Sequence, residues 1–165
     1  MVKRRCLFLD RDGVINVKAP HDDYIRRWSD FQFLPGIAGL IRLFNVLDFL
    51  VIIVTNQRGI ARQLMNESAL ELIHRNMLEE LGRAGARVDD IFYCPHEEGE
   101  CECRKPRPGM VMEAEKRWNI DLSASLLIGD SPSDQQLAAN CGLAFAMARN
   151  GEIIDVLPAS SVGPG

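Results

Sequence analysis

Residues 6–13, CLFLDRDG, run from four apolar residues directly into an acidic turn. An uninterrupted apolar run of this kind is typical of a strand that is buried on both faces of a parallel sheet. Residues 49–54, FLVIIV, form a second such run. Between the two, residues 35–47 place apolar side chains at helical spacing after Pro35 and Gly36. Strand, helix and strand in this order predict the first unit of an α/β fold.

The same alternation continues along the rest of the chain. Helical patterns cover residues 67–84, 108–118 and 133–140, and strand patterns cover residues 88–93, 126–128 and 143–147. Parallel strands need a covering connection between them, so we predict a parallel sheet with helices on both faces. We expect one domain over residues 1–158 and a flexible tail over residues 159–165.

Composition excludes several classes of protein. The chain has 165 residues, of which 47% are hydrophobic and 25% charged, and its net charge is -4. These values are ordinary for a globular protein and lack the basic excess of a dedicated nucleic-acid-binding protein. The apolar runs are far shorter than the roughly 20 residues of a membrane-spanning helix, and residues 6–9 are too few for a signal peptide. We therefore expect a cytoplasmic protein with no nucleic-acid or membrane partner.

Acidic residues follow two of the predicted strands. Asp10 and Asp12 come directly after the first strand, and Asp130 follows the strand at 126–128. Mg²⁺ prefers oxygen ligands and commonly takes one or two carboxylates, so Asp10 and Asp130 are candidate ligands of one ion. Asp12 is then free for proton transfer. Taken alone, an acidic turn is equally compatible with carboxylates that cap backbone amides, and Asp134 is also a candidate helix cap.

Donors suited to a phosphoryl group lie at two other places. Thr55, Asn56 and Gln57 follow the second strand and offer a hydroxyl group and side-chain amides. Lys105 can supply a positive charge that binds phosphate. The guanidinium group of Arg104 can donate paired hydrogen bonds to another anionic or hydroxylated part of a substrate. Considered singly, either basic residue is also compatible with a solvated surface position.

The cysteines predict a second kind of site. Cys94, His96, Cys101 and Cys103 give the spacing Cys-x-His-x₄-Cys-x-Cys. A Cys₃His set suits tetrahedral Zn²⁺ and leaves no open coordination position, so the zinc in the loop 94–103 would be structural. Cys6 and Cys141 stand in apolar surroundings and are predicted to be core thiols.

These pieces, in this order, resemble the motifs of the haloacid dehalogenase superfamily of phosphotransferases. The matching positions are Asp10-x-Asp12 for the first motif, Thr55 for the second, Lys105 for the third, and Asp130 with Asp134 for the fourth. The resemblance covers almost the whole chain, and the joint occurrence of the motifs is highly specific. It implies a Rossmann-like parallel sheet and an Mg²⁺-dependent phosphatase, with Asp134 beside the metal ligands.

The resemblance also implies a role for each motif residue. Asp10 would be the nucleophile that becomes an aspartyl-phosphate, and Asp12 would be the acid for the leaving alcohol and then the base for water. Mg²⁺ would be held by Asp10, Asp130 and the backbone carbonyl of Asp12. Thr55 and Lys105 would complete a cradle for the phosphoryl group.

The zinc loop narrows the resemblance to a subgroup without a large cap domain, which contains the heptose 1,7-bisphosphate 7-phosphatases and the histidinol-phosphate phosphatases. Residues 55–62, TNQRGIAR, and residues 103–110, CRKPRPGM, are similar to the heptose enzymes. Two departures are Gln63, where those enzymes usually have Gly, and the short gap before Cys101. Without a cap, short loops must contact the substrate. The candidate contacts are Asn56, Gln57, Arg58, Arg62 and Arg104.

Several functions stay open at this point. The leading hypothesis is removal of the 7-phosphate of D-glycero-D-manno-heptose 1,7-bisphosphate on the pathway to nucleotide-activated heptose, with histidinol phosphate as the alternative substrate. A polynucleotide 3′-phosphatase would carry a basic groove, which the acidic composition disfavours. A non-catalytic zinc-dependent interaction module would not need the acidic motifs. We expect a small phosphorylated sugar as the ligand and a monomeric chain.

Overall fold

The computed structural model describes residues 1–21 and 23–159, so residues 160–165 of the predicted tail lie outside the described residues. The strands are β1 Cys6–Leu9, β2 Leu50–Asn56, β3 Asp90–Cys94, β4 Leu126–Gly129, β5 Ala144–Arg149 and β6 Glu152–Leu157. The α-helices are α1 Ile37–Val46, α2 Glu67–Arg83, α3 Gly109–Trp118 and α4 Pro132–Cys141, and the short 3-10 helices are η1 Trp28–Asp30 and η2 Leu122–Ala124. Within the described ranges, no helix combines the length and the apolar character needed to cross a membrane.

The strands form a single sheet in the order β3-β2-β1-β4-β5-β6. β1 lies at the centre and pairs in parallel with β2 and with β4. This is the strand order of doubly wound nucleotide-binding folds, in which ligands bind where the order reverses. Here the order reverses between β1 and β4, and the residues that follow these two strands are Asp10 and Asp130.

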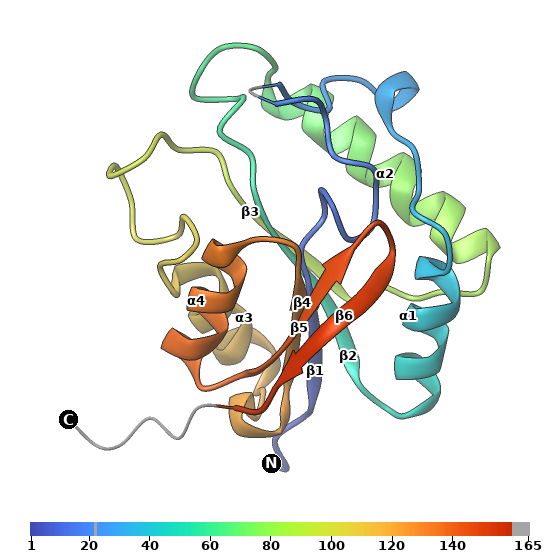
Figure 1. Cartoon of the computed structure of the whole chain (residues 1–165), viewed down its shortest axis with the longest axis vertical. Coiled ribbons are helices and arrows are strands. Elements are labelled where there is room, and N and C mark those ends of the chain that lie inside the picture. Colours follow the sequence, from blue (N-terminus) through green and yellow to red (C-terminus); the bar gives the residue numbers. More distant parts are fainter. Residues whose placement is uncertain (22, 160–165) are drawn as a thin grey trace.

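The central strands are buried between two layers of helices. In β1, Cys6 and Phe8 pack with residues of α3 and α4, whereas Leu7 and Leu9 pack with residues of α1 and α2. Figure 1 shows the two pairs of helices on opposite sides of the sheet. Because both faces are covered, apolar side chains occupy every position of the strand instead of alternating with polar ones. The predicted sheet with helices on both faces is confirmed.

β6 is an addition to the predicted sheet. It pairs antiparallel with β5, and the turn between them contains Asn150 and Gly151, with φ angles of 51° and 84°. Two successive residues with positive φ are typical of the tight turn that joins hairpin strands. The side chains of β6 are exposed or, at Leu157, half-buried. This edge strand therefore lacks the apolar run by which the inner strands can be recognised.

Two strands near the site, β2 and β3, have boundaries that differ from the prediction. β2 continues through Asn56, and β3 begins at Asp90 and ends at Cys94. Asn56 and Cys94 are register partners in the parallel pair. The end of the second strand therefore lies directly beside the beginning of the predicted zinc loop.

Candidate active site

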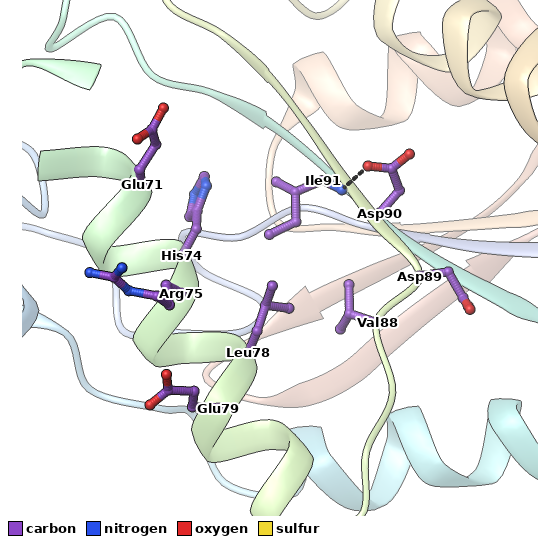
Figure 2. Close-up of a pocket in the computed structure, with 9 residues that line it drawn as sticks. All are labelled: Glu71, His74, Arg75, Leu78, Glu79, Val88, Asp89, Asp90 and Ile91. Atoms are coloured by element: carbon purple, nitrogen blue, oxygen red, sulfur yellow. Dashed lines mark hydrogen bonds between the residues drawn. The ribbon is translucent and has the colours of Figure 1, made fainter. Parts of the chain in front are cut away.

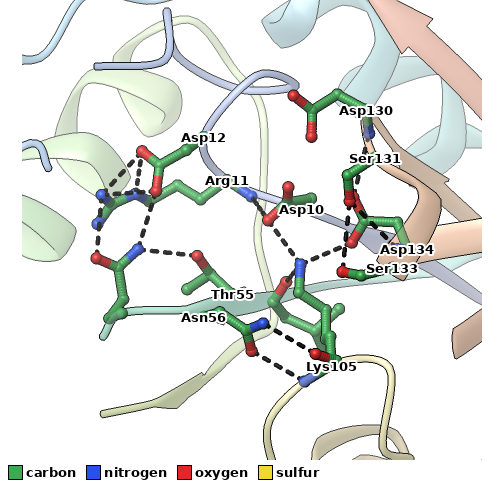
Figure 3. Close-up of polar contacts among 12 residues, drawn as sticks. Asp10, Arg11, Asp12, Thr55, Asn56, Lys105, Asp130, Ser131, Ser133 and Asp134 are labelled. Atoms are coloured by element: carbon green, nitrogen blue, oxygen red, sulfur yellow. Dashed lines mark hydrogen bonds and ion pairs between the residues drawn. The ribbon is translucent and has the colours of Figure 1, made fainter. Parts of the chain in front are cut away.

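The acidic motifs meet at the carboxyl ends of the central strands. Asp10 follows β1, Asp130 follows β4, and Thr55 lies near the end of β2. Because β1 pairs in parallel with both of its neighbours, these three ends reach the same edge of the sheet. Lys105 reaches this edge from the loop between β3 and α3. Figure 3 shows the four side chains gathered around one centre.

Gly13 allows the turn after β1 to approach Asp130 closely. Its φ of 92° is in the left-handed region, which favours glycine. A Cβ atom at this position would lie 2.1 Å from Oδ2 of Asp130, far inside van der Waals contact. Any side chain at residue 13 would therefore displace the carboxylate of Asp130.

Lys105 joins two carboxylates in the buried part of the site. Its Nζ donates to Oδ1 of Asp10 at 2.8 Å, to Oδ1 of Asp134 at 2.7 Å, and to the carbonyl oxygen of Val54 at 3.1 Å. All three charged side chains are buried. Burial acts to lower the pKa of Lys105, but the two carboxylates outweigh burial and raise it. The lysine therefore stays protonated.

The two carboxylates on Lys105 differ in their ionisation. Burial, and then the charge of Asp134, raise the pKa of Asp10 well above its usual value despite the nearby lysine. Burial also acts to raise the pKa of Asp134, but Lys105 and the hydroxyl of Ser131 outweigh it and lower that pKa. The pKa values of the two carboxylates are thus shifted in opposite directions. A further positive charge near Asp10 would favour its ionised form.

Asp10, Asp130 and Asp134 form a group that can hold a metal ion. Each offers a carboxylate oxygen, and these oxygens lie within 4.8 Å of one another. Oδ1 of Asp130 is buried and has no hydrogen-bond partner among the described residues, while Oδ2 accepts from Lys18 Nζ at 2.7 Å. Anionic oxygens are the ligands that Mg²⁺ prefers. The donor set and the unpartnered oxygen therefore fit a magnesium ion.

The side chain of Asp12 is held by other partners. Its carboxylate accepts hydrogen bonds from Arg11 Nη2 at 2.9 Å, Asn16 Nδ2 at 2.9 Å and Gln57 Nε2 at 3.0 Å. Burial acts to raise the pKa of Asp12, but the charge of Arg11 and these hydrogen bonds outweigh it and lower the pKa. Figure 3 shows Asp12 turned toward Arg11 and away from Asp130. The group of three potential metal-binding carboxylates thus contains Asp134 and not the side chain of Asp12.

Gln57 and Asn56 support the site from the end of β2. Gln57 Nε2, besides contacting Asp12, donates to Oγ1 of Thr55 at 2.9 Å. Asn56 Oδ1 accepts from the backbone N–H of Lys105 at 3.0 Å, and its Nδ2 donates to the carbonyl oxygen of the same residue at 3.3 Å. Asn56 therefore fixes the segment that carries Lys105.

A cavity of about 250 Å³ opens over these residues. Its lining includes Asp10, Asp12, Asn56, Arg104, Lys105 and Asp130. The Nη1 atom of Arg104 is buried and has no hydrogen-bond partner within the described part of the chain. A buried guanidinium donor without a partner is costly unless a ligand satisfies it. This atom therefore marks a polar contact point for a bound molecule.

Arg58 and Arg62, which we predicted to contact the substrate, lie against the zinc loop. Arg58 Nη1 is 3.0 Å from Glu97 Oε1, and Arg62 Nε is 3.2 Å from Glu97 Oε2. Arg58 Nε also donates to the hydroxyl of Tyr24 at 3.2 Å. Neither arginine is among the described residues that line the cavity. Together they connect the zinc loop to the loop that contains Tyr24.

The predicted zinc ligands also come together. Cys94, His96, Cys101 and Cys103 each place one ligand atom within 4.8 Å of the others. The sulfur of Cys101 lies 3.5 Å from that of Cys94 and 3.3 Å from that of Cys103, and His96 Nδ1 lies 3.2 Å from Cys103 Sγ. Zn–S bonds of about 2.3 Å in a tetrahedral site separate two sulfurs by about 3.8 Å, so only a small outward shift is needed. The group fits a closed structural zinc site.

Several residues at the site carry no recognisable signal in the sequence. Lys18 and Tyr24 line the cavity from the loop between β1 and η1. Arg11 is fully buried, and its Nη1 lies 3.1 Å from Nε2 of His74 on α2. Lys18, Tyr24 and His74 belong to no motif, Arg11 occupies the unassigned position of Asp10-x-Asp12, and their contacts depend on how the chain folds over the end of the sheet.

Known proteins are similar to this chain in sequence and in fold. The HAD-hydrolase-like family model matches residues 102–154. The D-glycero-beta-D-manno-heptose-1,7-bisphosphate 7-phosphatase of Rhodopseudomonas palustris is 43% identical over 93% of this chain and 88% of its own length. The D-glycero-alpha-D-manno-heptose-1,7-bisphosphate 7-phosphatase of Campylobacter jejuni is 40% identical over 92% of this chain and 86% of its own length.

Solved structures agree with these sequence relatives. The D,D-heptose 1,7-bisphosphate phosphatase of B. bronchiseptica, crystallised with magnesium and phosphate, has a TM-score of 0.82 and 37% identity, and the match covers 89% of this chain and 83% of that chain. The D,D-heptose 1,7-bisphosphate phosphatase from Burkholderia thailandensis has a TM-score of 0.66 and 27% identity, over 90% of this chain and 81% of that chain. The likeness thus extends over nearly the whole fold.

Proposed function

The chain belongs to the haloacid dehalogenase-like hydrolases, in the family of the D-glycero-D-manno-heptose-1,7-bisphosphate 7-phosphatases, and is therefore a phosphoric monoester hydrolase. We propose that its reaction is removal of the 7-phosphate of D-glycero-D-manno-heptose 1,7-bisphosphate. The observation that carries this proposal is the placement of Asp10, Lys105 and Asp130 in one cavity with the unpartnered guanidinium donor of Arg104. A zinc-dependent module without catalytic activity would have no use for this arrangement.

In the proposed reaction, Asp10 is the nucleophile and Asp12 transfers the proton. An oxygen of Asp10 forms a bond to the phosphorus of the 7-phosphate while the bond from phosphorus to the C7 oxygen breaks. Asp12 must enter this step protonated, against its lowered pKa, and it donates that proton to the C7 oxygen. Water then attacks the phosphorus of the aspartyl-phosphate, and Asp12 accepts its proton. Inorganic phosphate leaves, and Asp10 is regenerated.

We propose Mg²⁺ as the cofactor of this reaction, held by Asp10, Asp130 and the backbone carbonyl of Asp12, with Asp134 beside them. When bound, the ion supplies the positive charge that lets Asp10 ionise and approach an anionic phosphate. Lys105 adds a fixed positive charge, since it is already 2.8 Å from Oδ1 of Asp10. Thr55 Oγ1 accepts from Gln57, which leaves the hydroxyl proton of Thr55 available to a phosphoryl oxygen.

The substrate proposal rests on Arg104. A heptose bisphosphate carries a second phosphate at C1, and a guanidinium group binds phosphate through paired, charge-assisted hydrogen bonds. Arg104 lines the cavity and has a buried donor without a partner among the described residues. Histidinol phosphate carries a cationic amine instead and would gain nothing from a guanidinium group. For Arg58 and Arg62 we propose an indirect role, through their hold on Glu97.

We expect Arg104→Ala to raise KM for heptose 1,7-bisphosphate by about 10- to 100-fold, because a charge-assisted hydrogen bond contributes roughly 1.5–3 kcal/mol. For the small ester p-nitrophenyl phosphate, which has no second phosphate, the increase should stay below about threefold. Steady-state kinetics with both substrates measure the two changes. Arg107→Ala is the matched control, because Arg107 is exposed and pairs with Glu102. Wild-type protein with a higher kcat/KM for histidinol phosphate than for the bisphosphate would overturn the substrate assignment.

We also propose that Zn²⁺ occupies the group formed by Cys94, His96, Cys101 and Cys103. Burial acts to raise the pKa of Cys101, but hydrogen bonds from Cys103 and from the backbone N–H of Arg104 outweigh it and lower the pKa to about 6, which favours the thiolate that binds metal. The loop also packs closely on α3, since a Cβ at Gly109 would lie 2.5 Å from the carbonyl oxygen of Glu102. The ion would thus fix the segment that leads into Arg104 and Lys105.

Cys103→Ser should lower the unfolding free energy by about 3 kcal/mol, or the Tm by roughly 6–12 °C, because the binding free energy of a structural zinc is coupled to the ordering of its loop. Elemental analysis should find zinc near one ion per wild-type chain and much less in the variant. Cys141→Ser, at a half-buried cysteine outside the cluster, is the control and should keep its zinc. The proposed zinc site would be refuted if elemental analysis finds no zinc in wild-type protein purified without chelator.

We propose a cytoplasmic location and a monomeric state for this enzyme. The cysteines of the zinc group are free thiols, which a reducing compartment preserves. One chain carries every residue assigned to the reaction, so the site needs no second copy. Its product, heptose 1-phosphate, would enter the synthesis of nucleotide-activated heptose and of lipopolysaccharide precursors.

A further inference from the structure

Arg11 is a fully buried cation whose guanidinium group contacts Asp12, His74 and, at 3.5 Å, Oε1 of Gln57. Its Nη2 donates to both oxygens of Asp12, at 2.9 and 3.2 Å, and its Nε donates to Oδ1 of Asp12 at 3.3 Å. Its Nη1 lies 3.1 Å from Nε2 of His74. The guanidinium group thus holds the carboxylate of Asp12 on one side and the imidazole of His74 on the other.

His74 must be the acceptor in its contact with Arg11. A guanidinium group only donates hydrogen bonds, so Nε2 of the imidazole carries no proton and the ring is neutral. Burial, and then the charge of Arg11, lower the pKa of His74 to about 3, which agrees with this geometry. The ring also packs edge-on against Tyr93, with centroids 6.1 Å apart. His74 is therefore a fixed, neutral acceptor.

We propose that His74 is a positioning residue for Asp12, because it accepts from Nη1 of Arg11 and so fixes the guanidinium group that holds the Asp12 carboxylate. This inference rests on the proposed function, in which Asp12 protonates the leaving oxygen. Without the acceptor, Nη1 of Arg11 would be a buried donor without its partner, and the guanidinium group would turn to satisfy it. Asp12 would then lose its alignment, and a small misplacement of a catalytic group is costly.

The surroundings of His74 permit substitutions that test this role. Figure 2 shows His74 on α2 among the residues that line an open groove between this helix and residues 88–91. The groove has a volume of about 640 Å³. A replacement side chain therefore has space on this side, and the contact to Arg11 can be removed without forcing a larger group into the core.

The test compares two leaving groups. His74→Leu should lower kcat/KM for heptose 1,7-bisphosphate by about 10- to 100-fold, because a sugar alkoxide needs the proton from Asp12. For p-nitrophenyl phosphate, whose leaving group needs no proton, the loss should stay below about threefold. The ratio kcat/KM is used because it reports the transfer to Asp10 and not the later hydrolysis. His74→Gln, which restores an acceptor near the place of Nε2, should recover most of the lost activity.

Two controls separate the possible causes. Ile73→Ala removes a buried side chain from the same helix without removing a polar contact to Arg11, so it should leave the ratio between the two substrates unchanged. Asp12→Asn should show the same dependence on the leaving group as His74→Leu, only larger. The positioning role alone would be overturned if Asp12→Asn gives the expected result but His74→Leu loses activity equally on both substrates. The same conclusion would follow if His74→Leu loses no activity. If Asp12→Asn shows no dependence on the leaving group, the proposed acid role is wrong and the role of His74 is refuted with it.

Discussion

Asp10→Asn should lower kcat by about 10⁴-fold or more, the scale of loss on removing a covalent nucleophile. The amide has nearly the shape of the carboxylate but cannot form the bond to phosphorus. The fold should survive, because the charge of Asp10 is already unfavourable in its place: burial and then Asp134 raise its pKa. A neutral group at this position therefore costs the folded state little, and the Tm should not fall.

Turnover of heptose 1,7-bisphosphate and intact-protein mass after acid quenching measure this effect. The wild-type chain should carry one phosphoryl group during turnover, and the variant should carry none. Asp23→Asn is a suitable control, since Asp23 lines the same cavity but pairs with Arg26 at 2.7 Å. We expect this control to keep most of its activity. Phosphoryl transfer in Asp10→Asn at the wild-type rate would exclude Asp10 as the nucleophile.

Lys105→Met should damage stability and activity together. It removes the cation between Asp10 and Asp134, and loss of one partner of a buried ion pair typically costs about 3–5 kcal/mol. It also removes the fixed positive charge beside the nucleophile, for which we expect a loss in kcat of about 10²–10³-fold. Both effects share one physical cause, an uncompensated pair of carboxylates.

The stability of Lys105→Met should also depend on pH. With the cation gone, the two close carboxylates repel, and in the folded state one of them has a pKa raised above its unfolded value of about 4. The folded form then binds more protons than the unfolded form, so stability is greatest at low pH and falls as pH rises through the folded pKa. Urea unfolding near pH 5 and near pH 8 measures this fall relative to wild type.

Lys18→Met is the matched control for Lys105. Lys18 pairs with Asp130 at 2.7 Å, but its side chain is 56% exposed. A pair exposed to this degree contributes less than about 1 kcal/mol, so this variant should unfold nearly as the wild type does. Lys105→Met with wild-type stability at both pH values would show that Asp10 and Asp134 do not depend on the lysine for their place in the fold.

The acidic motifs and the zinc group could be predicted because they depend on local order along the chain. In a parallel sheet, residues that follow neighbouring strands reach one edge, so Asp10 and Asp130 meet without further information. The zinc ligands lie within a few positions of one another, and their residue types already suit the metal. The structure brings together each of these predicted groups.

Contacts between separate loops could not be predicted in this way. Arg11 and His74 stand 63 residues apart and meet only because α2 packs beside the turn that follows β1. Arg58 and Arg62 have the charge expected of phosphate contacts, but both pair with Glu97 in the structure. Neither pairing follows a repeating pattern, so sequence spacing contains no trace of it.

Two features of the backbone have a sequence signal: the turn at Asn150 and Gly151, and the left-handed conformation of Gln63. Asn150 and Gly151 form a tight turn, and an Asn-Gly pair is by itself a signal for a hairpin turn. Gln63 has a φ of 58°, in the left-handed region that glycine adopts without strain. This conformation accounts for the glycine expected at that position.

The contact between Gly13 and Asp130 couples two positions that lie 117 residues apart in the sequence. Because a methyl group at residue 13 would occupy the space of the Asp130 carboxylate, the two positions cannot drift independently. A position without any functional group thus limits where the acidic side chain can lie.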